Sequence, residues 1–157
     1  SNDFWAAGFS FGSWITLQLV MRRPEIENYI LVAPPATKYD FNFIVPCGSN
    51  GMVIQGEDDT ISLENDSFQL YEKLDTRDDA SMVYKTIEGA DHFFKNRLDD
   101  FNSAVDNHIK SCLINDENKI RKVKRDRRRR RKTKVNVEKR PERNQFPVKS
   151  LSFFENL

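Results

Sequence analysis

The chain has 157 residues, of which 38% are hydrophobic and 31% are charged, so its length and composition suit one globular domain with a short addition. The net charge of +1 conceals two opposite parts. Residues 1–118 contain 9 Lys or Arg and 20 Asp or Glu (net −11), whereas residues 119–157 contain 16 and 4 (net +12). An acidic body is therefore followed by a basic tail. No apolar run in the sequence approaches the roughly 18 residues that a membrane-spanning helix needs.

The cysteines and the N-terminus bear on the cellular compartment. Cys47 and Cys112 match no metal-binding spacing and are too few for a disulfide framework, so we expect two buried or half-buried thiols in a reducing environment. Residues 1–5 do not form the basic region that precedes an apolar stretch in a signal peptide. We therefore expect a cytoplasmic protein.

The first half of the body predicts a strand, a helix and a second strand. Residues 4–9 form a short apolar run that ends in a turn, as a buried parallel strand does. Apolar positions in residues 11–22 favour a helix, which Pro24 ends. Residues 29–33 predict a second buried strand. A loop of about 15 residues follows it, and loops of that length inside compact domains are often functional.

The second half of the body repeats this alternation. Residues 52–55 predict a third strand, residues 63–74 a helix, residues 82–87 a fourth strand, and residues 96–113 a last helix. The fourth strand alternates only partly between apolar and polar residues, as an edge strand does. Strands that alternate with helices predict an α/β fold with about four parallel strands flanked by helices.

The helical pattern fails from Lys119 onward. Pro141 and Pro147 would interrupt any helix there, and the apolar content is too low to build a core. We therefore divide the chain into a domain over residues 1–116 and a basic tail over residues 117–157, which we expect to be disordered or partly helical.

A Gly-x-Ser-x-Gly motif at residues 8–12 lies where the first predicted strand turns into the first predicted helix. This is the context of a nucleophile elbow, in which a strained turn lifts the serine clear of the sheet. Ser10 is then the expected nucleophile, the Phe11 N–H an oxyanion donor, and the two glycines allow strand and helix to approach closely. The alternative is an ordinary serine at a helix N-terminus.

A serine hydroxyl needs a base to take its proton and an acid to orient that base. Asp59 follows the third predicted strand and His92 follows the fourth, so parallel strands would carry both to the edge that holds Ser10. Asp58 is the alternative to Asp59. His108 lies within the last predicted helix, where we expect a half-exposed residue without a catalytic role.

Four segments in this order, GFSFG, APPATKYDF, GEDDT and GADHFF, resemble the small bacterial α/β-hydrolases of the dienelactone-hydrolase and serine-esterase type, over about residues 4–112. The resemblance implies the C-terminal half of an α/β-hydrolase fold that hydrolyses esters or related acyl compounds through an acyl-enzyme, without metal or cofactor. In that family the acid stands three residues after the strand-ending glycine, which is Asp59 here. Tyr39, Phe41 and Phe43 would line an acyl pocket, or else serve only in packing.

The segments that precede the nucleophile strand in this family have no counterpart here, including the loop that supplies a second oxyanion donor. The chain also lacks an initiator Met. We therefore expect a truncated or split reading frame with an intact triad and weak activity. The first strand would present an open apolar edge, through which the chain could dimerise.

The basic tail suggests a second role. Residues 119–134 contain 12 Lys or Arg, opposed only by Asp126. Such a block favours phosphate backbones or anionic lipid, without base-specific recognition. The alternatives are a solvated extension, or a non-catalytic hydrolase-like protein whose tail binds RNA or anionic membrane.

Overall fold

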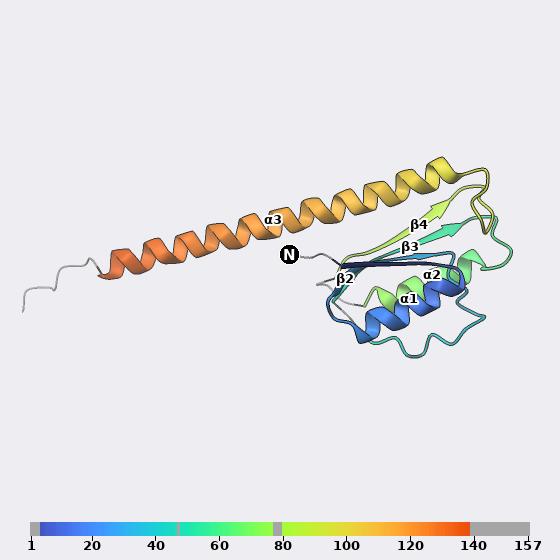
Figure 1. The fold of residues 1–157 in the computed structure, drawn as a ribbon, viewed down its shortest axis with the longest axis horizontal. Coiled ribbons are helices and arrows are strands. Elements are labelled where there is room, and N and C mark those ends of the chain that lie inside the picture. Colours follow the sequence, from blue (N-terminus) through green and yellow to red (C-terminus); the bar gives the residue numbers. More distant parts are fainter. Residues whose placement is uncertain (1–3, 47, 77–79, 139–157) are drawn as a thin grey trace, which may run out of the picture. The chain divides into compact units, whose positions relative to one another are not determined.

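The computed structural model describes residues 4–46, 48–76 and 80–138 (Figure 1). Cys47, Pro141 and Pro147 lie outside the described residues, and the expectations about them stay predictions. The elements follow one another in the order β1 (Phe4–Phe9), α1 (Phe11–Arg22), β2 (Ile26–Val32), β3 (Asn50–Gly56), α2 (Glu64–Leu74), β4 (Met82–Ile87) and α3 (Leu98–Glu138). The chain forms two compact units, which divide between Ser111 and Cys112.

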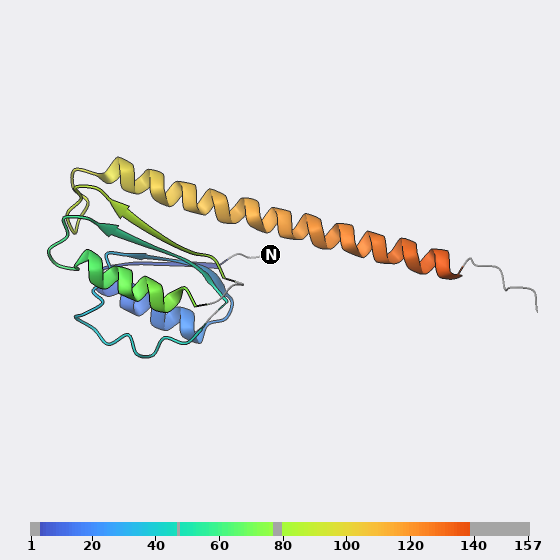
Figure 2. The same cartoon turned by 180° about the vertical axis from the view of Figure 1, so that it is seen from behind.

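The four strands form one sheet in the order β1-β2-β3-β4, and every neighbouring pair is parallel. The predicted α/β fold with four parallel strands is confirmed. The arrows of β3 and β4, which Figure 2 shows in teal and yellow-green, point the same way. Because the sheet is parallel, the segments that follow β1, β2, β3 and β4 all leave from one edge. That edge is where the candidate residues are expected.

Side chains of β2 and β3 alternate between two apolar clusters, one on each face of the sheet. Tyr29, Leu31 and Val53 pack with Leu17 of α1 and Leu70 of α2. The other face carries Ile30, Val32, Met52 and Ile54, against which the first turns of α3 place Phe101, Ala104, Val105 and Ile109. Burial on both faces explains why residues 30–32 of β2 and 52–54 of β3 are apolar without interruption.

Strands β1 and β4 are the two outermost strands of the described sheet, and each has a neighbouring strand on one side only. Phe4 and Phe9 of β1 are exposed, as is Val83 of β4, so apolar side chains reach the surface at both edges. The open apolar edge expected for the first strand is therefore present among the described residues. Dimerisation through it remains a prediction.

Helix α3 differs from the sequence-based expectation. It begins at Leu98 and continues to Glu138, so the prediction that it ends near residue 113 is wrong. Apolar periodicity stops there, but residues 113–131 contain neither Pro nor Gly and many residues with good helix propensity. Ion pairs one turn apart, Lys119–Asp116 and Arg121–Glu117, add to this local preference. The division of domains at residue 116 remains a prediction.

His108 was expected to be half-exposed, and this expectation is wrong. Its side chain is buried, and its ring lies edge-on to Trp5 with 6.1 Å between the ring centres. Burial lowers the pKa of the His108 imidazole. The helical repeat alone did not show that this position faces the sheet.

Among the described residues, no helix combines the length and the apolar character needed to cross a membrane.

The buried imidazole of His108 predicts a loss of stability in mild acid. Below about pH 6.5 the unfolded chain binds a proton that the folded chain binds only at lower pH, so the free energy of unfolding should fall as the pH falls. Urea unfolding at about pH 7.5 and about pH 5.5 measures this difference. It should be smaller in His108→Leu, and an unchanged difference would contradict the assignment to His108.

Candidate active site

Ser10 occupies a strained turn between β1 and α1. Its backbone has φ 51° and ψ −121°, a conformation that L residues rarely adopt. Its N–H donates to the Val32 carbonyl at 2.8 Å, which ties the turn to the end of β2. A strained serine at the N-terminus of a helix is the conformation that the motif predicts, and the role of Ser10 as a nucleophile remains a prediction.

The two glycines of the motif differ in what they do. A Cβ on Gly8 would lie 2.2 Å from the Gly12 carbonyl oxygen and 2.4 Å from Thr16 Oγ1, so the approach of β1 to α1 requires glycine there. A Cβ on Gly12 would meet nothing within 4 Å. The expectation that both glycines allow close approach is therefore wrong for Gly12. The buried Ser13 Oγ completes the turn, 2.8 Å from the Gly8 carbonyl oxygen and 3.0 Å from that of Val32.

Asp59 presents a fully buried carboxylate in the turn after β3. Oδ1 accepts two backbone N–H groups, those of Ile61 and Ser62, each at 2.8 Å. Oδ2 accepts the Gln55 side-chain amide at 2.9 Å and lies 2.7 Å from His92 Nδ1. Four donors thus occupy the acceptor sites of this carboxylate, as a buried negative charge requires.

His92 connects this carboxylate to the serine. Its side chain is 6% exposed, and its Nε2 lies 3.0 Å from Ser10 Oγ while Nδ1 faces Asp59. Since an ionised carboxylate only accepts hydrogen bonds, Nδ1 carries the proton, and Nε2 is left to accept the Ser10 hydroxyl. The structure therefore brings Ser10, His92 and Asp59 into one hydrogen-bonded chain.

The other acidic residues nearby have different surroundings. Asp58, the alternative to Asp59, is exposed, and its backbone N–H donates to the Ala90 carbonyl. Glu57 accepts the Gly89 N–H at 3.0 Å, and Asp91 Oδ1 accepts the N–H groups of Phe93 and Lys95 at 3.1 Å. These contacts hold the turns on either side of His92. The geometry thus places Asp59, rather than Asp58, against the imidazole.

Gln55 is a site residue that the sequence analysis missed. It is fully buried on β3, and its amide donates to Asp59 Oδ2 and lies 2.8 Å from the Ser62 carbonyl oxygen. Its own carbonyl oxygen accepts the Ser67 hydroxyl of α2 at 2.7 Å. A polar residue inside an otherwise apolar strand was the available signal, because a buried amide needs polar partners.

The predicted substrate-binding residues lie in different surroundings. Tyr39 is 39% exposed, and its ring centre lies 5.2 Å from that of Phe11, next to Ser10. Phe41 is buried in the core cluster and stacks on Phe43, so packing accounts for its position. A role for these three rings in substrate binding remains a prediction.

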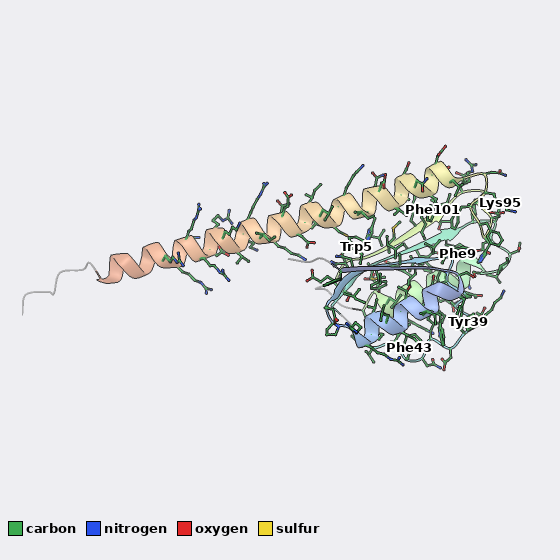
Figure 3. All side chains as sticks on the ribbon, in the orientation of Figure 1. Trp5, Phe9, Tyr39, Phe43, Lys95 and Phe101 are labelled. Atoms are coloured by element: carbon green, nitrogen blue, oxygen red, sulfur yellow. The ribbon has the colours of Figure 1, made fainter. Side chains whose placement is uncertain are left out.

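Exposed aromatic side chains also surround the imidazole. The Phe9 ring centre lies 5.0 Å from that of His92, Phe93 lies at 5.2 Å, and the Lys95 ammonium stands 5.6 Å above the Phe93 ring. Figure 3 shows Phe9, Tyr39 and Lys95 toward the end of the sheet to which the strands point, away from Trp5. Among the described residues, no group of three or more His, Cys, Asp or Glu side chains is arranged to hold a metal ion.

Proteins of known structure share this arrangement of strands and helices. No family model matches the sequence. One solved structure is that of a protein of unknown function from Agrobacterium tumefaciens, described as a putative α/β hydrolase. It is 41% identical to this chain with a TM-score of 0.69, and the match covers 72% of this chain and 52% of the Agrobacterium chain. A serine hydrolase without a lid from Xanthomonas campestris is 30% identical with a TM-score of 0.57, covering 68% and 46%. The chain carries part of the α/β serine hydrolase fold.

An uncharacterised protein of Rickettsia prowazekii is 42% identical over 106 residues, which cover 65% of this chain and 44% of that protein. The chain thus spans about half the length of the proteins to which it is similar. The resemblance to bacterial α/β hydrolases is confirmed. Within this part of the α/β-hydrolase fold, Ser10, Asp59 and His92 follow β1, β3 and β4 at one edge of the sheet.

The glycines of the elbow offer a matched pair of substitutions. Gly8→Ala should lower the free energy of unfolding by about 1–3 kcal/mol or more, because the added Cβ collides with backbone atoms of α1. Gly12→Ala should be neutral or stabilising by up to about 1 kcal/mol, because its Cβ meets open space in a helix. Urea unfolding of both variants tests this, and equal effects would contradict the assigned difference.

Proposed function

We propose that this chain supplies the catalytic triad of a serine hydrolase that acts on an ester or related acyl substrate through an acyl-enzyme. The observation that carries the proposal is the chain from Ser10 Oγ to His92 Nε2 and from His92 Nδ1 to Asp59, with bonds of 3.0 and 2.7 Å. A strained serine at a helix N-terminus, hydrogen-bonded to an oriented imidazole, is the arrangement that activates a hydroxyl.

In this mechanism, Ser10 Oγ attacks the acyl carbon while His92 Nε2 takes its proton. Asp59 holds the Nδ1–H tautomer and stabilises the imidazolium that forms. The imidazolium then protonates the leaving alcohol, which departs and leaves the acyl group bound to Ser10. A water molecule then attacks the acyl-enzyme ester while His92 takes a proton from the water. The acid product leaves when His92 returns that proton to Ser10 Oγ.

Stabilisation of the tetrahedral intermediate falls to the N-terminus of α1. The first N–H groups of a helix have no partners within the helix, and the helix dipole is positive at this end. The Phe11 N–H follows the nucleophile directly and is the proposed oxyanion donor. One such donor typically contributes about 10²–10³ in rate, so activity should depend on how many donors are present.

For the substrate, we propose an acyl group that lies against aromatic side chains. Tyr39 and Phe43 are the proposed contacts, and Tyr39 is supported by its exposure and by its contact with Phe11. The buried Phe41 would act indirectly, because its ring stacks on that of Phe43. The second candidate function is a non-catalytic hydrolase-like protein that acts only in binding. A fluorophosphonate probe distinguishes the two, because it reacts with an activated serine whatever the natural substrate is.

The probe should label the chain at Ser10, as located by peptide mass spectrometry. Ser10→Ala should abolish the label, whereas Ser103→Ala, which removes an exposed hydroxyl from α3, should leave it unchanged. His92→Ala should abolish p-nitrophenyl acetate turnover because it removes the base. The chain should stay folded but become less stable, because the buried Asp59 carboxylate loses one of its four donors. A folded chain that stays unlabelled would favour the non-catalytic alternative.

Gln55→Met should slow labelling by about 10- to 100-fold, since a hydrogen bond to a charged group contributes about 1.5–3 kcal/mol. The reason is that Asp59 loses the donor on the same oxygen that faces His92. Gln69→Met, the same change at an exposed position on α2, is the control and should label at the normal rate. A normal rate for a folded Gln55→Met chain would show that this amide does not position the acid.

A further inference from the structure

Residues 119–131 of α3, here called the basic segment, carry no role in the chemistry above. They contain ten Lys or Arg and one Asp, a net charge of +9, and all thirteen side chains are exposed. They lie within one continuous helix, in the second of the two compact units. We propose that the basic segment binds double-stranded nucleic acid through its phosphate backbone.

The charge spacing matches this ligand. At a rise of about 1.5 Å per residue the thirteen residues extend over about 20 Å, which is close to one net positive charge every 2 Å. Duplex DNA carries one negative charge per about 1.7 Å of its axis. Binding therefore releases condensed counterions and is sensitive to salt.

The distribution of charge around the helix separates a nucleic acid from a membrane surface. Ile120 and Val123 are exposed, but from Lys124 onward no apolar residue follows within the segment. Successive residues turn by about 100°, so the five consecutive arginines Arg127–Arg131 point to every side of the helix. Side chains in Figure 3 project to both sides of this part of α3. An amphipathic helix that inserts into a lipid surface needs an apolar face, and residues 124–131 contain no apolar side chain.

The diameter of the helix and the hydrogen bonding of arginine both suit a nucleic-acid duplex. An α-helix with its side chains is about 10–12 Å across, and the major groove of B-DNA is about 12 Å wide, with phosphates along both walls. Guanidinium groups on all sides of a helix can then reach both strands at once, and each can bind phosphate through two N–H groups. Contacts of this kind position a protein on the duplex and do not read its sequence.

Fluorescence anisotropy with the full chain and a labelled duplex, at about 50 mM and about 200 mM salt, tests the proposal. Replacing Arg127–Arg131 by Gln removes five charges and keeps good helix propensity. This variant should bind about 100-fold more weakly or worse, with a slope of log affinity against log salt that is shallower by about 4. The affinities for duplex DNA and duplex RNA are measured in parallel, and the duplex that binds more tightly identifies the source of the phosphates.

The matched control removes five exposed positive charges from the first unit. In this variant Gln replaces Arg22, Lys38, Lys73, Lys85 and Lys110. It should bind either duplex as the unchanged chain does. Equal weakening in both variants, or no binding to either duplex at low salt, would overturn the proposal. So would binding to phosphatidylserine vesicles with none to nucleic acid. None of these results depends on whether Ser10 is reactive, so the proposal fails or stands separately from the hydrolase.

Discussion

The carboxylate of Asp59 is buried without access to water, and four hydrogen-bond donors compensate for that burial. Two of them belong to the turn that follows β3, one comes from β3 itself through Gln55, and one comes from His92 after β4. The shape of the turn, the pairing of β3 with β4 and the orientation of the imidazole are therefore linked. If any donor is lost, a buried charge is left partly unsatisfied, which is costly.

Backbone strain collects at the same edge of the sheet. Among the described residues other than glycine, Ser10, Ala33 and Phe94 have positive φ, and they follow β1, β2 and β4 respectively. Such conformations persist only where the surrounding structure holds them. Here the two apolar clusters hold the strands from both faces, and the Ser10 and Ala33 N–H groups donate to the carbonyls of Val32 and Ile54. The packed sheet thus supports the strained turn at Ser10.

The chain combines an acidic unit, which holds the candidate active site, with a helix that becomes strongly basic. The two features have different physical bases. The first depends on distances of about 3 Å between buried groups, which only a packed sheet can maintain, whereas the second depends on a high density of exposed charge along one helix. This chain spans about half the length of the proteins to which it is similar. The proposal of a hydrolase therefore covers the triad and does not extend to the complete substrate-binding pocket.

The sequence by itself determined the four strands, their parallel arrangement and the order of Ser10, Asp59 and His92, because apolar periodicity, turn residues and the Gly-x-Ser-x-Gly motif are local signals. The family resemblance favoured Asp59 over Asp58, and the tertiary structure places Asp59 against the imidazole, a difference that local patterns do not show because adjacent residues in a turn differ only in direction. It also revealed the partners of Gln55, the burial of His108 and the open space at Gly12. Burial and hydrogen bonding arise between segments far apart in the chain, and a local pattern carries no record of them.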